Sequence, residues 1–386
     1  MRSHKSHTIT SDEVQSCVSS WLSEAVALPD HGWKCTSAVV WMLLIRAAAR
    51  QQSISAACRD LKDAPSDQAM LNALHDGLPK YTRVLERHLV AALQTKLPRK
   101  LLRRSREVAI DWHLIPYHGE PQQSANELYH SVPKSGTTKF HAYATACVVE
   151  DGWRYTIALT WIKKGEKPVE VLKRLWEQIA QIGLNIKVLL LDRQFFSVPV
   201  MNWLIGQRQP FLMPVVLRGR KSQTRRKATR LRAFHQQPAG WYSYTHGNKT
   251  CSVSISICVA YKSYANRKTQ KRNHKKLLFA AWGVQRSPRA TCELYRRRFG
   301  IESSYRQLQQ ARIRTCTRDP KLRLLFVGVA LVLRNVWVWL HATRLADPGG
   351  ELRLERLRFR RLLEWLAMYA YSQLHDNSPP YVAIDD

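Results

Sequence analysis

Three acidic residues have the types and positions needed for metal-assisted chemistry. Asp111 follows the apolar run 108–110, Asp192 follows a second apolar run, 188–191, and Glu302 lies in a later segment whose pattern is helical. Carboxylate oxygens are the hard ligands that Mg²⁺ prefers. Two such ions roughly 3.5–4 Å apart can stabilise both the attacking and the leaving oxygen of a phosphoryl displacement. We therefore predict that these three acids bind metal and form a catalytic site for phosphodiester chemistry.

The acids lie in a strongly basic chain. Its 386 residues include 61 Lys and Arg against 29 Asp and Glu, which gives a formal net charge of +32. A surplus of this size in a folded chain indicates a polyanionic partner. Membrane-surface binding and a ribosomal-type protein are the alternatives, but 13 Trp residues and a patterned apolar interior disfavour a tail-like ribosomal protein. Nucleic acid is the expected partner.

The cysteines and the apolar runs disfavour several other classes. The eight Cys residues are scattered without any Cys-x2-Cys pair, so a zinc ribbon is not supported and a reducing compartment fits. The N-terminus is polar and lacks the apolar core of a signal peptide. The longest apolar runs, 38–45 and 324–333, are shorter than the about 20 residues that span a bilayer. We expect a soluble, cytoplasmic protein without a membrane partner.

Residues 1–105 are predicted to form a helical N-terminal region that binds DNA or dimerises. Helical patterns cover 33–49, 53–61, 66–75 and 81–97. Ser66 is the first residue of the third range and is a typical N-cap residue. The two short helices in the middle could form a helix-turn-helix that contacts DNA, or could serve packing and dimer contacts, and the pattern leaves both open.

Residues 106–210 are predicted to form the first part of an RNase H-like core. The expected elements are a strand at 108–111, a loop at 112–119, strands at 143–149 and 153–161 joined by a turn at 151–152, a helix at 168–182, a strand at 187–191 and a helix at 195–205. In that topology the first strand and the strand after the helix are neighbours. Asp111 and Asp192 should therefore meet at one edge of the sheet.

Residues 211–285 are predicted to be a basic, β-rich insertion into that core. Positions 211–280 hold 16 Lys and Arg and no Asp or Glu. Strand candidates are 241–244, 251–258 and 276–282, with a turn at 246–248. The basic loops at 218–232 and 262–276 favour phosphate contacts over a merely solvated surface. The residues predicted to bind DNA there are Arg225, Arg226, Lys227, Lys271 and Arg272.

Residues 286–345 are predicted to complete the core, and residues 346–386 to form a helical tail. Pro320 separates the helix of the third acid from a long apolar helix at 322–345, and a final amphipathic helix covers 352–374. The predicted fold class is therefore α/β. An RNase H-like catalytic core, interrupted by a β-rich insertion, lies between a helical N-terminal region and a helical C-terminal tail.

The helix around the third acid shows a second signal. Tyr295, Arg298, Glu302, Arg306 and Gln309 recur at spacings of three and four, so they should share one helix face. A face of Tyr, Arg, carboxylate and amide is poor core material. It suits a metal ligand flanked by groups that bind phosphate and stack a base, although a solvated, salt-bridged helix is the alternative. We predict that the Tyr, both Arg and the Gln contact DNA.

These motifs resemble those of a known family, the DDE transposases of the insertion-sequence-four superfamily. Tyr295-x2-Arg298-x3-Glu302 is similar to their Tyr-Arg-Glu-Lys signature. The sequences that end in Asp111 and Asp192 look like their first and second Asp motifs. The resemblance therefore links the three acids to one site.

The resemblance covers about 106–345, and one position in it departs from the signature. The signature's Lys, seven residues after the Glu, is Gln309 here. Arg306 is the residue that would take over its phosphate contact. The departure concerns the handling of the terminal DNA strand more than the metal chemistry.

The resemblance implies a DNA transposase that excises and integrates an insertion sequence by cut and paste. The three acids would bind two Mg²⁺, with Mn²⁺ as a substitute. One ion would activate water to hydrolyse a phosphodiester at the element end, and the freed 3′-hydroxyl would attack the opposite strand, giving a hairpin, and later the target. The implied partners are double-stranded DNA, both terminal inverted repeats and target, and a second copy of the chain as a homodimer in the synaptic complex. The implied location is the prokaryotic cytoplasm, with action at the nucleoid.

Two other functions remain compatible with the sequence. A non-catalytic DNA-binding protein derived from a transposase would bind element ends without Mg²⁺-dependent cutting. A structure-specific nuclease would hydrolyse DNA but never join it. The intact acids disfavour the first, and the family-like helix disfavours the second.

Overall fold

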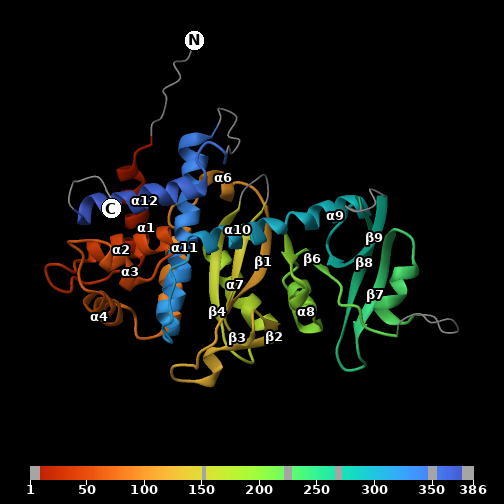
Figure 1. Ribbon diagram of the computed structural model, residues 1–386. Coiled ribbons are helices and arrows are strands. Elements are labelled where there is room, and N and C mark those ends of the chain that lie inside the picture. Colours follow the sequence, from red (N-terminus) through yellow and green to blue (C-terminus); the bar gives the residue numbers. More distant parts are fainter. Residues whose placement is uncertain (1–8, 150–153, 221–227, 266–271, 347–353, 376–386) are drawn as a thin grey trace, which may run out of the picture. The chain divides into compact units, whose positions relative to one another are not determined.

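The computed structural model describes residues 9–149, 154–220, 228–265, 272–346 and 354–375 (Figure 1). The chain divides into two compact units. The helical unit comprises Met1–Pro98, Ile115–His141 and Ser304–Asp386. The sheet unit comprises Arg99–Leu114 and Ala142–Ser303. Each unit is thus assembled from segments that are distant in sequence.

Helices make up most of the helical unit. The Ser66 side chain accepts a hydrogen bond from the backbone N of Ala69 at 3.2 Å, so it is the N-cap that the sequence predicts. The helices of this unit are α1 (Ser11–Ala25), α2 (Ser37–Arg50), α3 (Ile54–Arg59), α4 (Asp67–Gly77), α5 (Thr82–Gln94), the 3-10 turn Ala125–Glu127, α11 (Pro320–Leu340), the π-helical turn His341–Leu345 and α12 (Phe359–Leu374).

Helix α11 is the central core element of the helical unit. It packs against α5, α1 and α2. A Cβ at Gly328 would lie 2.6 Å from Cδ2 of Leu89, so the missing side chain allows α11 and α5 to approach closely. The segment Pro320–Leu345 is long and apolar enough to cross a membrane, contrary to the expectation from its apolar runs, but 94% of its most apolar window is buried inside the protein. A core helix accounts for this composition.

The strands form a mixed sheet in the order β2-β3-β1-β5-β6-β9-β8-β7, with β4 paired to β3. The β1–β5 and β5–β6 pairs are parallel. The pairs β3–β4, β6–β9, β8–β9 and β7–β8 are antiparallel. The bounds are β1 (Arg106–Pro116), β2 (Tyr129–Lys134), β3 (Thr137–Val148), β4 (Tyr155–Ile162), β5 (Ile186–Leu191), β6 (Phe211–Pro214), β7 (Gly240–Gly247), β8 (Ser252–Ala265) and β9 (Arg272–Trp282).

Short helices pack on the sheet unit (Figure 1). Helix α7 lies against β4, as the predicted crossover requires, and α9 lies against β8. Gln178 of α7 is buried and bonds both backbone groups of Leu159 on β4, each at 3.0 Å, which ties the helix to the strand. The remaining helices of this unit are α6 (Arg99–Leu102), α7 (Pro168–Gln181), the 3-10 turn Arg193–Phe195, α8 (Val198–Gly206), the 3-10 helix Arg230–Gln236 and α9 (Pro288–Arg296). In helix α10 (Phe299–Gln310), residues 299–303 are assigned to the sheet unit and residues 304–310 to the helical unit.

The structure corrects several element boundaries. The final amphipathic helix, predicted from residue 352, begins only at Phe359. The first strand does not end at Asp111 but continues to Pro116, because Trp112 and Ile115 are buried and extend the strand through the predicted loop. The predicted helix at 195–205 begins as a 3-10 turn and becomes α-helical only at Val198. The predicted basic loop at 262–276 is partly strand, since Lys262 of β8 pairs with Lys275 of β9. The predicted turn at 151–152 lies outside the described residues.

Candidate active site

Parallel pairing of β1 with β5 brings two of the predicted acids to the same level. Ile110 pairs with Leu191, so the residues that follow them, Asp111 and Asp192, lie side by side. The Asp111 side chain is 12% exposed and that of Asp192 is 29% exposed. Asp192 directly follows its strand, as predicted, whereas Asp111 lies inside β1.

All three predicted acids gather around one buried guanidinium, that of Arg298. Its Nη1 donates to Oδ2 of Asp111 at 2.9 Å, and its Nη2 donates to Oε1 of Glu302 at 2.7 Å. The same Nη2 lies 3.7 Å from Oδ1 of Asp192. The Arg298 side chain is only 8% exposed. The structure therefore brings Asp111, Asp192 and Glu302 together, with a cation of the protein itself between them.

A break in the predicted helix places this guanidinium. The structure has α9 ending at Arg296 and α10 beginning at Phe299, so Tyr295 and Glu302 do not share the face of one helix, contrary to the prediction. The amides of the two residues between the helices make i→i−3 hydrogen bonds, Arg297 N to Leu294 O and Arg298 N to Tyr295 O. This tight turn lets consecutive arginines reach different partners.

The tyrosine of the signature holds this turn against the sheet. The Tyr295 hydroxyl donates to the carbonyl oxygen of Leu191 at 3.2 Å, and its ring packs on Phe279 with centroids 5.0 Å apart. The Arg298 guanidinium lies 5.6 Å from the Tyr295 ring centroid. Tyr295 is 7% exposed, so in this structure it is a buried residue that packs against the end of β5.

Glu107 is a fourth acid at the site and is not among the residues predicted from the sequence. It lies four residues before Asp111 on β1, hence on the same strand face, and it is fully buried. Nη1 of Arg297 donates to its Oε2 at 2.7 Å, and Nη2 of Arg286 lies 3.6 Å from its Oε1. Two acids on one strand face thus bind two consecutive arginines. The sequence held one signal for Glu107: it is a charged residue directly before the apolar run 108–110, on the same strand face as Asp111.

Burial and charge shift the pKa values at the site in opposite directions. Burial raises the pKa of Asp111 to about 6, which Arg298 opposes and the charge of Asp192 reinforces. Burial disfavours the charged form of Arg298, but the neighbouring Tyr295 and carboxylates hold its pKa above its usual value. Burial likewise raises the pKa of Tyr295 above its usual value. The Arg298 guanidinium is therefore held in its charged form, and the pKa of Asp111 lies above the ordinary value of an aspartate.

The donor set fits a hard divalent cation in its chemistry. The side chains offer only carboxylate oxygens, which are the ligands that Mg²⁺ prefers. In all three residues, Asp111, Asp192 and Glu302, a carboxylate oxygen faces the guanidinium of Arg298. Within the described ranges, no three side chains of His, Cys, Asp or Glu close on a common point at metal-binding spacing. The spacing of the carboxylates in this structure is the one that Arg298 imposes.

The other residues predicted to contact DNA follow Glu302 along α10 or belong to the basic insertion. Arg306 and Gln309 lie on α10, one and two turns beyond Glu302; Arg306 is exposed and Gln309 is half-buried. Arg272 is the first residue of β9, and the prediction for its side chain lies outside the described part of the structure. The predictions for Arg225, Arg226, Lys227 and Lys271 also fall outside the described residues.

Comparisons with known proteins bear on the family and the fold of the chain. A family model described as a transposase DDE domain matches residues 103–334. Among solved structures, the chain is similar to a cryo-EM structure of a piggyBac transposase synaptic complex with hairpin DNA, at 12% identity and a TM-score of 0.52, over 94% of this chain and 78% of that chain. At this identity the likeness concerns the fold, and it fits the predicted α/β, RNase H-like core. No curated protein matches the chain.

Proposed function

Since the chain belongs to the transposase DDE domain family, we propose that it is a cut-and-paste DNA transposase of the insertion-sequence-four type. It would excise and integrate an insertion sequence by cutting and joining phosphodiester bonds. The observation that carries this proposal is the convergence of Asp111, Asp192 and Glu302 on one guanidinium, two of them at the same level of parallel strands. The net charge of +32 suits a DNA partner.

The three carboxylates are the residues that would hold two Mg²⁺ or Mn²⁺. When bound, the metal pair supplies charge stabilisation of the attacking and leaving oxygens. The strands fix the two Asp residues, and α10 presents Glu302 to them. The Arg298 guanidinium can exchange its hydrogen bonds to the carboxylates for hydrogen bonds to a DNA phosphate, because its planar set of N–H donors fits either anion. Tyr295 keeps that arginine at the end of β5.

The proposed substrates are the two terminal inverted repeats of an element and a target duplex. Because both ends must be processed together, the proposal includes a homodimer in the synaptic complex. The similar solved structure is itself a synaptic complex, that of piggyBac transposase with hairpin DNA. The protein's contribution to phosphoryl transfer is positioning and charge stabilisation.

A cleavage and joining assay tests the proposal. The substrate is a supercoiled plasmid that carries the coding frame with its native flanking DNA, incubated with Mg²⁺ and a target plasmid. Asp192→Asn and Glu302→Gln should each reduce excision at least about 100-fold, since loss of a ligand exceeds the 10–100-fold effect of outer partners. Glu293→Gln is the matched control, because this acid of α9 is 59% exposed and, among the described residues, forms an ion pair only with Arg289 one turn away.

Each alternative function has its own outcome in this assay. Cleavage without joined products would indicate a nuclease in place of a transposase. DNA binding without Mg²⁺-dependent cleavage would indicate a non-catalytic descendant. Unchanged excision by Asp192→Asn or Glu302→Gln would show that the cluster is not the active site.

A further inference from the structure

A short turn between β4 and α7 carries three exposed lysines. Lys163, Lys164 and Lys167 lie within five residues, and their only acidic neighbour in the turn is Glu166. None of the three ammonium groups forms an ion pair in the part of the chain that the structure describes. We call the residues Lys163 to Lys167 the lysine turn.

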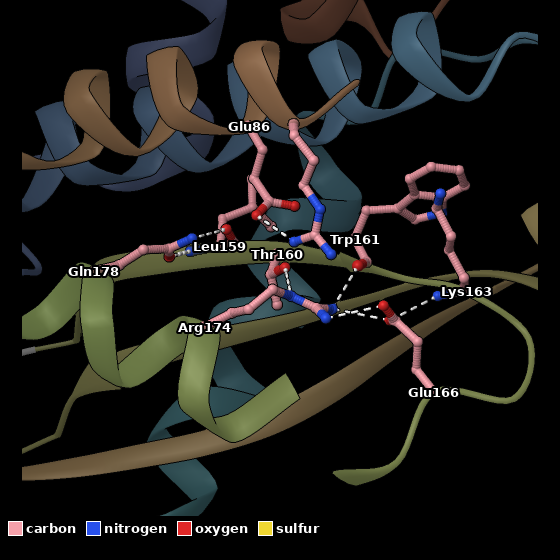
Figure 2. A network of polar contacts seen from close by, with 9 residues as sticks. Glu86, Leu159, Thr160, Trp161, Lys163, Glu166, Arg174 and Gln178 are labelled. Carbon is pink, nitrogen blue, oxygen red and sulfur yellow. Dashed lines mark hydrogen bonds and ion pairs between the residues drawn. The ribbon is translucent and has the colours of Figure 1, made fainter. Parts of the chain in front are cut away.

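The lysine turn is held in one conformation by its own acid and a helix arginine (Figure 2). Arg174 of α7 forms a two-pronged ion pair with Glu166, Nη1 to Oε1 and Nη2 to Oε2, both at 2.9 Å. The same arginine donates to Oγ1 of Thr160 at 2.9 Å and to the carbonyl oxygen of Trp161 at 3.0 Å. The Glu166 carboxylate also accepts from the backbone N of Lys163 at 3.0 Å.

This internal pairing leaves the lysine charges for an external partner. The Arg174 and Glu166 side chains are 18% and 20% exposed, so the single negative charge of the turn is largely enclosed and neutralised. Gly165 has φ of +79°, which lets the turn close without strain. Helix α7 begins directly after the turn, and the positive end of its dipole adds to the lysine charges. The lysine turn is therefore an ordered surface with an excess of positive charge.

The lysine turn leaves the sheet at the same edge as the catalytic acids. The register between β1 and β3 is set by two backbone hydrogen bonds, Val149 N to Glu107 O and Tyr117 N to Lys139 O, each at 3.0 Å. They run antiparallel and place Thr145 of β3 beside Asp111, and Thr145 pairs with Leu159 of β4. Strand β4 therefore runs in the same direction as β1, and its carboxyl end leads into the lysine turn.

The register also gives the approximate distance between Asp111 and the lysine turn. Lys163 lies four residues beyond Leu159, which is level with Asp111, and two strands to the side of β1. At about 3.3 Å per residue and about 4.8 Å per strand, Lys163 is about 16 Å from Asp111. This span corresponds to about five base pairs at about 3.4 Å each. A duplex bound at the acids is long enough to reach the lysine turn.

We propose that the lysine turn binds the phosphate backbone of the duplex whose scissile phosphate lies at Asp111 and Asp192. The proposal rests on the proposed function, and adds to it a second, sequence-independent DNA contact that sets the position of the duplex on the sheet edge. Phosphate contacts of this kind fix register and orientation without base recognition. Because the turn is preformed, little conformational entropy is lost when it binds.

The test measures how DNA affinity depends on salt. The probe is a duplex of arbitrary sequence, and the variant is Lys163→Ala/Lys164→Ala/Lys167→Ala in the full chain. The matched control is Arg103→Ala/Arg104→Ala/Lys187→Ala, which removes the same charge from exposed residues at or before the starts of β1 and β5, at the opposite edge of the sheet.

Three lost phosphate contacts should reduce the slope of log affinity against log salt by about 2.7, which corresponds to about 500-fold weaker binding at about 0.1 M salt. The control variant should change the slope by less than about one. Wild-type binding with equal slopes in the two variants would overturn the role of the lysine turn and leave the proposed function standing. A wild-type protein without salt-dependent DNA binding would overturn the proposed function itself.

Discussion

Replacing Arg298 by Gln removes the cation around which the catalytic acids are arranged. The guanidinium contacts Asp111 at 2.9 Å, Glu302 at 2.7 Å and Asp192 at 3.7 Å. If these acids are metal ligands, a bound metal and the guanidinium compete for the same oxygens. The variant should therefore be less stable without metal and should bind metal more tightly than the wild type.

The size of the effect follows from the burial of each carboxylate. The pKa of Asp111 is raised from 3.8 to about 6, which already lowers the free energy of unfolding at pH 7 by about 3 kcal/mol. If Asp111 were fully protonated in the folded state at pH 7, the free energy of unfolding would be lowered by about 4.4 kcal/mol in total. Loss of Arg298 can thus add at most about 1.4 kcal/mol there. Glu302 is 43% exposed, so its pair is screened and contributes about 0.2–1 kcal/mol. The expected destabilisation is about 1.5–2.5 kcal/mol, which would appear as about 10–70-fold tighter metal binding.

Urea denaturation in EDTA and calorimetric titration with Mg²⁺ and Mn²⁺ measure both quantities. Arg297→Gln is the control, because this neighbouring arginine pairs with Glu107 and not with the three acids. It should lower stability without tightening metal binding. If Arg298→Gln were as stable as the wild type in EDTA, or bound metal no more tightly, the proposed competition would be refuted.

Three further predictions concern single charged or titratable groups. Metal affinity should fall about tenfold per pH unit below about pH 6, because the raised pKa of Asp111 lets a proton displace the metal; a flat binding profile down to about pH 5 would contradict this. Arg297→Ala should destabilise the protein by up to about 3–5 kcal/mol in urea, against about 1.5–3 for Glu107→Gln, because only the first leaves the charge of a fully buried carboxylate, with Arg286 at 3.6 Å but without its 2.7 Å partner; equal losses would refute the asymmetry. Burial lowers the pKa of His141 from 6.5 to about 3, so the unfolded chain takes up a proton before the folded protein does as the pH falls. The free energy of unfolding should therefore decrease by about 2 kcal/mol between about pH 6.5 and pH 5. Chemical denaturation over this pH range measures the decrease, and an equal decrease in His141→Phe would contradict its assignment to His141.

The succession of strands and helices was predictable because it depends on local patterns. The crossover helix at 168–182 and the strand at 187–191 are present as α7 and β5, since their apolar spacings match the periods of helix and strand. The parallel neighbours β1 and β5 were also expected, and the register of Ile110 with Leu191 confirms that Asp111 and Asp192 meet. Two kinds of prediction failed. The end of β1 was wrong, because the buried Trp112 and Ile115 extend the strand past Asp111. The single helix expected around Glu302 is broken between Arg296 and Phe299.

The sequence by itself determined the three acids, the basic charge and the resemblance to DDE transposases. These depend on residue types and on order along the chain. Only the tertiary structure decided what lies between the acids, because a guanidinium that reaches a strand 187 positions away leaves no local pattern. The same holds for Glu107 and its arginines, and for the lysine turn, whose place at the catalytic edge depends on the register of three strands. Long-range pairing set these positions, and it is invisible to any short window of sequence.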